Sequence, residues 1–336
     1  MTGPTASTAR PSARPAVVVG EILCDLFTPE RGVLLAEAPV LVPHVGGAPA
    51  NVAIALGWHG HRVEMVSALG GDALSGRMRR ILEDHGVGLD HVETKAGELV
   101  GLLLIAVDSD GERHFHPYRE GTADLMMTPD SLPQALIEGA ALLHAGTVTL
   151  REEPVRGTTR RAIALAREAG VPVSIDVNLR PKLFSDAGVM LELAREAARG
   201  ADILKASRDE AVMMLGPGTI DRLVDDLHAM GPALVLLTDG DGPFVVSSAV
   251  ARIVMRPPKV TAVDTTGAGD AFIGAALAHL LERGLGEDAV TGGRPLEWLA
   301  GLSSEALEAL GRFASGHGAR AVTALGATGA FAPRNT

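Results

Sequence analysis

Residues 264–284 read DTTGAGDAFIGAALAHLLERG, and the first seven, Asp264 to Asp270, combine two acids and two threonines with a Gly-Ala-Gly turn. From Ala271 onward, apolar residues recur at helical spacing, and Gly284 ends the run. The pattern predicts a helix that begins at about Asp270. Because the first amides of a helix have no partner within it and carry the positive end of its dipole, the glycine turn predicts an anion site.

The acid at position 270 is the candidate reactive group of this stretch. An aspartate at a helix start often only caps the helix, but a cap does not need the rest of the heptad. Phosphoryl transfer needs fixed donors for the developing charge, a divalent metal on the nucleotide, and a carboxylate that accepts the proton of the attacking alcohol. Asp270 beside the amides of Gly267, Ala268 and Gly269 would supply both the base and the anion hole.

A second glycine motif, Gly46-Gly47-Ala48-Pro49-Ala50-Asn51, precedes another expected helix. Two glycines there let a sugar-sized ligand lie against the backbone, and Asn51 offers a donor and an acceptor to a hydroxyl group. Alone, the motif could equally be a Gly-Gly turn with an asparagine cap. Its occurrence together with the first motif favours a ligand site.

Outward from these motifs, apolar segments alternate with amphipathic ones. Most of the expected strands are continuous apolar runs, which are typical of strands buried on both faces in a mainly parallel sheet between two helix layers. Two segments, 32–43 and 99–118, break the alternation and are expected to form hairpin-like strands of a small separate sheet. We expect strands at 17–20, 142–145, 173–176, 203–205 and 234–238, and helices at 50–59, 74–85, 160–169, 190–199 and 220–230.

Composition and charge exclude several classes of function. The 336 residues carry a formal charge of −11, so nucleic acid and anionic membranes are not expected partners. The single cysteine, Cys24, cannot form an internal disulfide, and residues 1–15 are expected to be a disordered tail without a secretion signal, which points to the cytoplasm. No lysine follows a glycine as a Walker A loop requires, and HExxH, GxSxG and CxxC are absent.

Taken together, the motifs resemble those of the ribokinase-like (PfkB) family of carbohydrate kinases. The family implies a three-layer α/β/α sandwich with a mainly parallel central sheet and a small β-sheet lid, here a kinase domain over 16–336 with lid segments at roughly 24–45 and 98–120. It also implies ATP and Mg²⁺ as cofactors and an aspartate base. The matching blocks are GEILCD (20–25), GGAPAN (46–51), GGD (70–72), DVNLRPKLF (176–184), LKASRDE (204–210), TDGDG (238–242), DTTGAGD (264–270) and ASGHGAR (314–320).

The resemblance also assigns roles. Asp270 is implied as the general base, with the anion hole at 267–269. Asp25, expected at the end of the first strand, is implied to contact sugar hydroxyls, although a plain turn residue is the alternative. The further substrate-binding candidates are Gly46, Gly47, Asn51, Arg119 and Arg180.

On the nucleotide side, the family implies binding by a glycine turn and by a loop at 314–318 near the adenine. Glu210 is implied to organise Mg²⁺ through water, or is a solvated helix carboxylate; Ser207 stands where many relatives have asparagine. Asp264 and Thr266 stand where many relatives hold a monovalent cation such as K⁺. The cofactor-binding candidates are Lys205, Thr238, Gly240, Gly242 and Gly316.

The substrate is less sharply indicated. DVNLRPKLF and LKASRDE resemble the blocks of fructokinases and 2-keto-3-deoxygluconate kinases, among other sugar kinases of the family, and YREGTAD (118–124) favours fructokinase, in particular its bacterial members. That resemblance implies phosphorylation of the fructose 6-hydroxyl group. A 2-keto-3-deoxygluconate kinase is the alternative, because Arg119 and Arg180 could clamp a sugar carboxylate, bind ATP phosphate or form ion pairs. A non-catalytic sugar or nucleotide sensor would show a lost base or a broken glycine turn, and neither is seen. Two expectations do not concern the substrate. Relatives often pair through lid strands, so a homodimer is expected.

The 284–304 stretch is expected to be a surface insertion between two helices.

Overall fold

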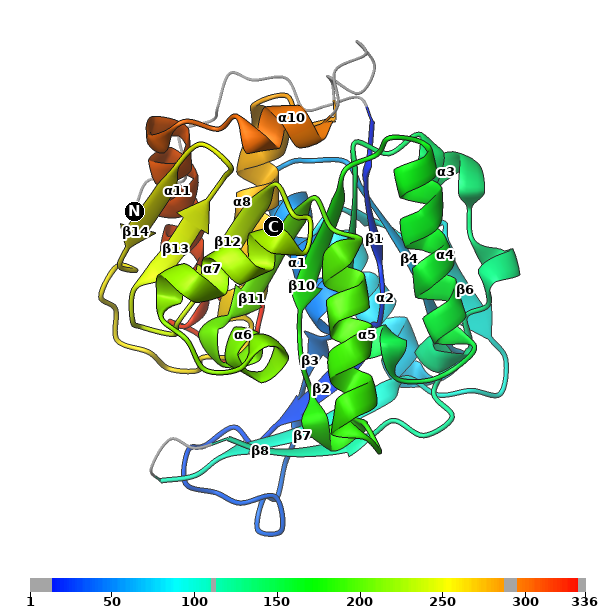
Figure 1. Ribbon diagram of the computed structural model, residues 1–336. Coiled ribbons are helices and arrows are strands. Elements are labelled where there is room, and N and C mark those ends of the chain that lie inside the picture. Colours follow the sequence, from blue (N-terminus) through cyan, green and yellow to red (C-terminus); the bar gives the residue numbers. More distant parts are fainter. Residues whose placement is uncertain (1–13, 110–112, 287–294, 332–336) are drawn as a thin grey trace.

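The protein is described by a computed structural model that covers residues 14–109, 113–286 and 295–331 (Figure 1). Its central feature is a ten-stranded sheet in the order β14-β13-β12-β11-β10-β9-β1-β4-β5, with β6 paired to β4. All strands from β12 to β5 run parallel, whereas β13 and β14 are antiparallel. The strands are β1 (Ala16–Val19), β4 (Val63–Gly70), β5 (Val87–Gly88), β6 (Val92–Lys95), β9 (Leu142–Gly146), β10 (Val173–Val177), β11 (Ile203–Ser207), β12 (Leu234–Thr238), β13 (Phe244–Ser247) and β14 (Arg252–Met255).

Helices cover both faces of this sheet, as the continuous apolar strands predict. In β1, Ala16 and Val18 belong to one hydrophobic core and Val17 and Val19 to the other, because successive strand residues point to opposite faces. On one face lie α1 (Ala48–Trp58), α2 (Ala73–Asp84), α8 (Ala268–Glu282), α10 (Pro295–Ala300) and α11 (Ser304–Ala321). On the other lie α3 (Gln134–Glu138), α4 (Val155–Glu168), α5 (Ala187–Arg199), α6 (Arg208–Leu215) and α7 (Ile220–Ala229).

A second sheet of four strands, which we call the lid sheet, lies beside the edge where the parallel strands end (Figure 1). Its order is β3-β2-β7-β8, from β2 (Leu23–Phe27), β3 (Val42–Gly46), β7 (Gly101–Val107) and β8 (Arg113–Tyr118). The predicted small sheet is therefore present, and the hairpin expected at 99–118 is confirmed. The hairpin expected at 32–43 is wrong: most of that stretch is a turn-rich connection, because Leu34 and Val40 are exposed rather than packed in a strand.

Two further expectations, for residues 1–15 and 284–304, concern segments of which only a part is described by the structure. Of the predicted tail, 1–13 lie outside the described residues, whereas Arg14 donates to the carbonyl oxygens of Gly139 (2.9 Å) and Gly286 (2.8 Å). Part of the predicted insertion at 284–304 also lies outside the described residues. In its described part Leu299 and Leu302 are buried, so the surface assignment is wrong there, because these side chains join the core.

Among the described residues, no helix is both long and apolar enough to cross a bilayer. The arrangement, with one large mainly parallel sheet, helices on both of its faces and one small separate sheet, matches the expected fold class.

Candidate active site

The candidate site lies at the carboxyl edge of the parallel sheet, beside the lid sheet. In open α/β sheets ligands bind at this edge, because the loops that follow parallel strands gather there. Strands β10, β11 and β12 end here at Val177, Ser207 and Thr238, and helix α8 begins here at Ala268. Both glycine motifs of the sequence therefore reach the same region.

The glycine turn is part of the helix rather than a segment in front of it. Helix α8 begins at Ala268, two residues before the expected start, so Asp270 is its third residue. Gly267 makes this possible because it precedes the helix with a φ of 76°, and a side chain there would collide with Ala327. The glycine turn thus forms the first helical turn, at 268–270, where the amide of Ala268 donates to the carbonyl oxygen of Thr265 at 3.5 Å.

Asp270 connects the two motifs directly. Its Oδ2 accepts a hydrogen bond of 2.7 Å from Nδ2 of Asn51, which stands in the first turn of α1. The carboxyl group is 9% exposed, and burial raises its pKa to about 6, with the negative charge of Asp176 adding to the effect. Asp270 is therefore ionised at neutral pH yet basic enough to accept a proton.

A buried ammonium group stands beside the glycine turn. Nζ of Lys205 on β11 forms an ion pair with Oδ1 of Asp176 on β10, at 2.9 Å. The same Nζ lies only 2.8 Å from the position that a side-chain carbon on Gly269 would take. The missing side chain at Gly269 thus lets the ammonium approach the first turn of α8, where it adds positive charge to the anion site.

The sequence predicts Asp25 at the end of the first strand, and this placement is wrong: Asp25 belongs to the lid sheet. It lies within β2, because the chain leaves β1 at Val19 and pairs again with β3 and β7. A side chain on Gly46 would collide with the Asp25 carboxyl group, so that glycine is needed for the approach of the two strands. Burial, together with the charge of Asp270, raises the pKa of Asp25 to about 7.

The two arginines behave differently. Arg119 is buried and paired with Asp124, so the ion-pair alternative is the correct one for part of its guanidinium group. Arg180 is exposed and donates to the carbonyl oxygen of Leu179. Its charge lowers the pKa values of Asp25 and Asp270, which places it on the same side of the site.

Several buried polar atoms in this region have no hydrogen-bond partner among the described residues. They are Oε2 of Glu21, Oδ1 of Asp25, Oδ1 of Asn51, and Nε and Nη1 of Arg119. Buried polar atoms in proteins are normally paired, so a group of them indicates a polar ligand. A mixture of acceptors and donors suits the hydroxyl groups of a sugar.

The residues predicted to bind the nucleotide include the end of β12 and the glycine turn that follows it. Thr238 ends β12, and Gly240 follows in a turn with a φ of 55°. Gly242 donates its amide to the carbonyl oxygen of Asp239 at 2.7 Å. The expected loop at 314–318 is wrong, because Gly316 lies inside α11, where close packing against α8 supports an unbroken helix through the glycines.

The candidate metal residues are occupied by backbone contacts. Glu210 is buried rather than solvated, and its two oxygens accept from the amides of Leu179 (3.1 Å) and Ser207 (2.8 Å). Asp264 accepts from Thr266 (2.9 Å to its amide) and from the amide of Gly326 (2.9 Å). Within the described ranges, no group of three or more His, Cys, Asp or Glu side chains could hold a metal ion.

Sequence reasoning missed three acids of the site. Glu21, Asp124 and Asp176 each lie inside a motif that marks the family, but no role followed from the sequence. For Glu21 and Asp176 the available signal was an acid within an apolar strand or beside one, since buried acids are rare without a partner; Asp124, in the 3-10 turn Ala123–Met126, carried no such signal. Asp176 is the clearest case, because it interrupts the apolar run of β10.

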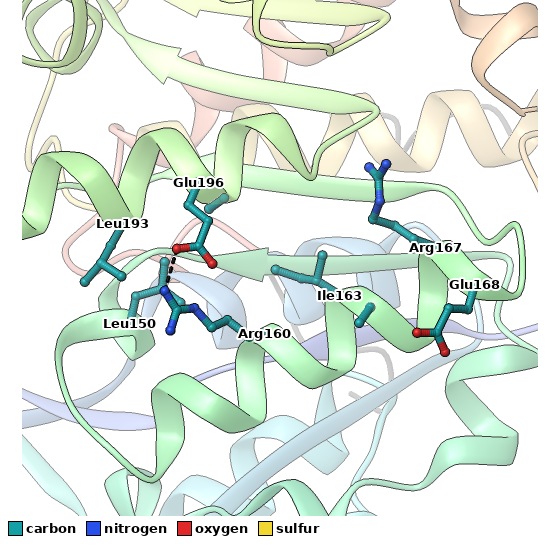
Figure 2. A pocket seen from close by; sticks show the side chains of 9 residues that line it. Leu150, Arg160, Ile163, Arg167, Glu168, Leu193 and Glu196 are labelled. Atoms are coloured by element: carbon teal, nitrogen blue, oxygen red, sulfur yellow. Dashed lines mark hydrogen bonds and ion pairs between the residues drawn. The ribbon is translucent and has the colours of Figure 1, made fainter.

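A hollow elsewhere on the surface contains none of the predicted residues. It has a volume of about 360 Å³ and lies between α4 and α5, where Figure 2 shows Ile163 and Leu193 beside the Arg160–Glu196 ion pair. These helices cover the face of the sheet opposite to α1 and α8. The hollow is therefore separate from the candidate site.

Known proteins resemble this chain in sequence over most of its length. The profile of the pfkB family of carbohydrate kinases matches residues 14–334. The chain is 38% identical over 275 residues to fructokinase-1 of Oryza sativa subsp. japonica, covering 79% of this chain and 83% of that protein. It is 35% identical over 267 residues to probable fructokinase-4 of Arabidopsis thaliana, covering 79% and 82%.

Solved structures show the same fold. Fructokinase with bound ATP from Xylella fastidiosa has a TM-score of 0.82 at 27% identity and covers 94% of both chains. A double mutant of fructokinase from Vibrio cholerae O395, in a form with bound fructose, ADP and potassium ion, has a TM-score of 0.82 at 26% identity and covers 97% of both chains.

Proposed function

The chain belongs to the pfkB family of carbohydrate kinases, and we propose that it transfers the γ-phosphoryl group of ATP to the 6-hydroxyl group of fructose. The curated relatives named above are fructokinases, and the Vibrio cholerae structure holds fructose. The observation that carries the proposal is the contact between Asp270 and Asn51 at the start of α8, beside buried polar atoms that lack partners.

The residues of the site suit this reaction. Asn51 holds one oxygen of Asp270, which leaves the other oxygen to accept the proton of the attacking hydroxyl group. The amides at 268–270 and the ammonium of Lys205 would stabilise the charge of the phosphoryl group. Asp25, with Gly46 and Gly47, would hold the sugar.

ATP and Mg²⁺ fit the residues that remain. Bound MgATP would supply the phosphoryl group and the divalent charge, with the nucleotide beside Thr238, Gly240, Gly242 and Gly316. Because both oxygens of Glu210 accept from amides, Mg²⁺ would rest on the phosphate groups and on water rather than on a protein cluster. A K⁺ ion beside Asp264 and Thr266 is supported by the potassium-bound form of the Vibrio cholerae enzyme.

The charge of the site favours a neutral sugar over a sugar acid. Glu21, Asp25 and Asp270 are all buried, and the charge of Asp270 raises the pKa values of both Glu21 and Asp25, so each of the three contributes negative charge to one region when ionised. Of the nearby cations, Arg119 is already paired with Asp124 and Lys205 with Asp176, which leaves the exposed Arg180 to offset this charge. The carboxylate of 2-keto-3-deoxygluconate would be repelled here, which makes fructose the better substrate.

Two features bear on assembly and location. Tyr118 (63% exposed) and Leu99 (62% exposed) present apolar surface at the ends of lid strands, which supports pairing of two chains through the lid sheets. Use of ATP as donor supports a cytoplasmic location. The sensor alternative is not favoured, since the base and the glycine turn are intact.

Initial rates with fructose, ribose and 2-keto-3-deoxygluconate at fixed MgATP test the function. We expect the highest kcat/KM with fructose and a product phosphorylated at the 6-hydroxyl group. Turnover of the sugar acid or of ribose without turnover of fructose would overturn the proposal.

A further inference from the structure

Glu21 and Arg119 stand at two of the places where the chain crosses between the main sheet and the lid sheet. Glu21 lies between β1 and β2, and Arg119 follows β8 directly. Gly47, at the crossing from β3 to α1, leaves room for Glu21, since a side-chain carbon there would lie 3.2 Å from Glu21 Cγ. Both side chains thus lie beside the proposed sugar-binding residues, next to Asp25.

Each of the two side chains is buried and has polar atoms without a hydrogen-bond partner among the described residues. Glu21 is 2% exposed, and its Oε2 has no partner among the described residues. Arg119 is 4% exposed; it is bound to Asp124 through Nη2, while Nε and Nη1 have no partner in the same part of the chain. Buried polar groups are normally hydrogen-bonded, and a polar ligand would supply the partners that these atoms lack.

The backbone brings the two side chains close together. Leu23, two residues after Glu21, pairs with Gly101, and a side-chain carbon on Gly101 would lie 3.4 Å from Nε of Arg119. Within the described ranges, no ion pair of 4.0 Å or less joins Glu21 to Arg119. The two groups are nevertheless close, because after burial the charge of Arg119 has the largest influence on the pKa of Glu21. Arg119 also lowers the pKa of Asp25, and Asp270 raises the pKa of Glu21, so both side chains adjoin the site.

We propose that Glu21 and Arg119 bind one hydroxyl group of the sugar between them. The hydroxyl oxygen accepts from an N–H group of Arg119, and the hydroxyl hydrogen is donated to Oε2 of Glu21. A hydroxyl group is the ligand group that satisfies both sides at once, whereas a carboxylate offers Glu21 no hydrogen and a CH₂ group satisfies neither. This inference rests on the proposed sugar kinase function and makes Glu21 a substrate-binding and specificity-determining residue.

A purely structural role is the competing explanation. Glu21 could brace the base of the lid sheet through a water molecule that also contacts Arg119. In that case the residue would affect stability, but it would not distinguish one position of the sugar from another.

The experiment compares wild type with Glu21→Gln and Glu21→Ala on fructose and on its 1-deoxy, 3-deoxy and 4-deoxy analogues, measured as kcat/KM at saturating MgATP. Fructose binding without ATP is measured by calorimetry. We expect the wild type to lose about 10–100-fold on one analogue, the usual range for a hydrogen bond to a charged group. In both variants we expect that loss to shrink to within about threefold, while the losses on the other analogues stay as in wild type.

Glu64→Gln is the matched control. Glu64 is also a buried glutamate with an unpartnered Oε2, but it lies near the opposite end of β4 from the site. It should leave the whole analogue profile unchanged.

An analogue profile in the Glu21 variants equal to that of wild type would overturn the proposal, whether or not their overall rates fall. Failure of the proposed function looks different, because the wild type would then not phosphorylate fructose. In that event the same comparison is made with the deoxy analogues of whichever sugar the wild type phosphorylates.

Discussion

Replacing Asp25 by Asn should make the free protein more stable at alkaline pH. The folded protein raises the pKa of this carboxyl group from 3.8 to about 7, chiefly through burial. Between these values the folded state keeps the proton that the unfolded state has lost, so stability falls as pH rises from about 4 to 7. Asparagine cannot ionise and escapes this loss.

The two pKa values set the size of the effect. The cost of Asp25 relative to a neutral residue is about 2 kcal/mol at pH 5 and about 4 kcal/mol at pH 8. The stability advantage of Asp25→Asn should therefore grow by about 2–3 kcal/mol over this interval, or roughly 5 °C in Tm for a domain of this size.

Thermal unfolding of both proteins at pH 5 and pH 8, without ligands, measures this difference. Sugar binding by calorimetry on the same samples should weaken in the variant, because it loses a hydroxyl acceptor. A variant that is less stable than wild type at pH 8, or whose advantage does not change with pH, would refute the assignment of Asp25 as a buried carboxyl group kept for binding.

Two further predictions concern the base and the glycine turn. The kcat/KM of the wild type should rise between about pH 5 and pH 7, because Asp270 has a pKa of about 6 and must be ionised to accept a proton. A pH–rate profile with its maximum below pH 5 would contradict this prediction. Gly269→Ala should cut kcat by roughly 10–100-fold in a folded protein, because the new methyl group displaces the Lys205 ammonium that Asp176 holds. The control is Gly76→Ala, whose added carbon would make only an ordinary contact, 3.8 Å from Nη1 of Arg80; a kcat for Gly269→Ala equal to that of this control would refute that reading.

The fold could be predicted further than the site. Continuous apolar runs identified β9, β10, β11 and β12 because strands buried on both faces need them. Strand β2 was missed, since the sequence LCDLF carries an acid in the middle. That acid, Asp25, is the one proposed above to hold the sugar, and functional residues are where local patterns and structure are expected to disagree.

The details of the site depended on long-range packing that the sequence does not display. The contact of Asp270 with Asn51 joins residues 219 positions apart, and only the fold brings them together. One local signal was available but unused: Ser207 and Glu210 have the spacing of a capping box, which the structure shows. That pattern would have predicted a backbone-bound Glu210 instead of a solvated helix carboxylate.

The steady-state rate of Asp270→Asn with fructose and MgATP tests the central claim most directly, when it is measured beside its ATP affinity and its Tm. Asparagine keeps the shape of the side chain but cannot accept the proton. We predict a fall in kcat of roughly 10²–10⁴-fold with ATP binding and folding preserved. Turnover within a few-fold of wild type in this variant would contradict the assignment of Asp270 as the base.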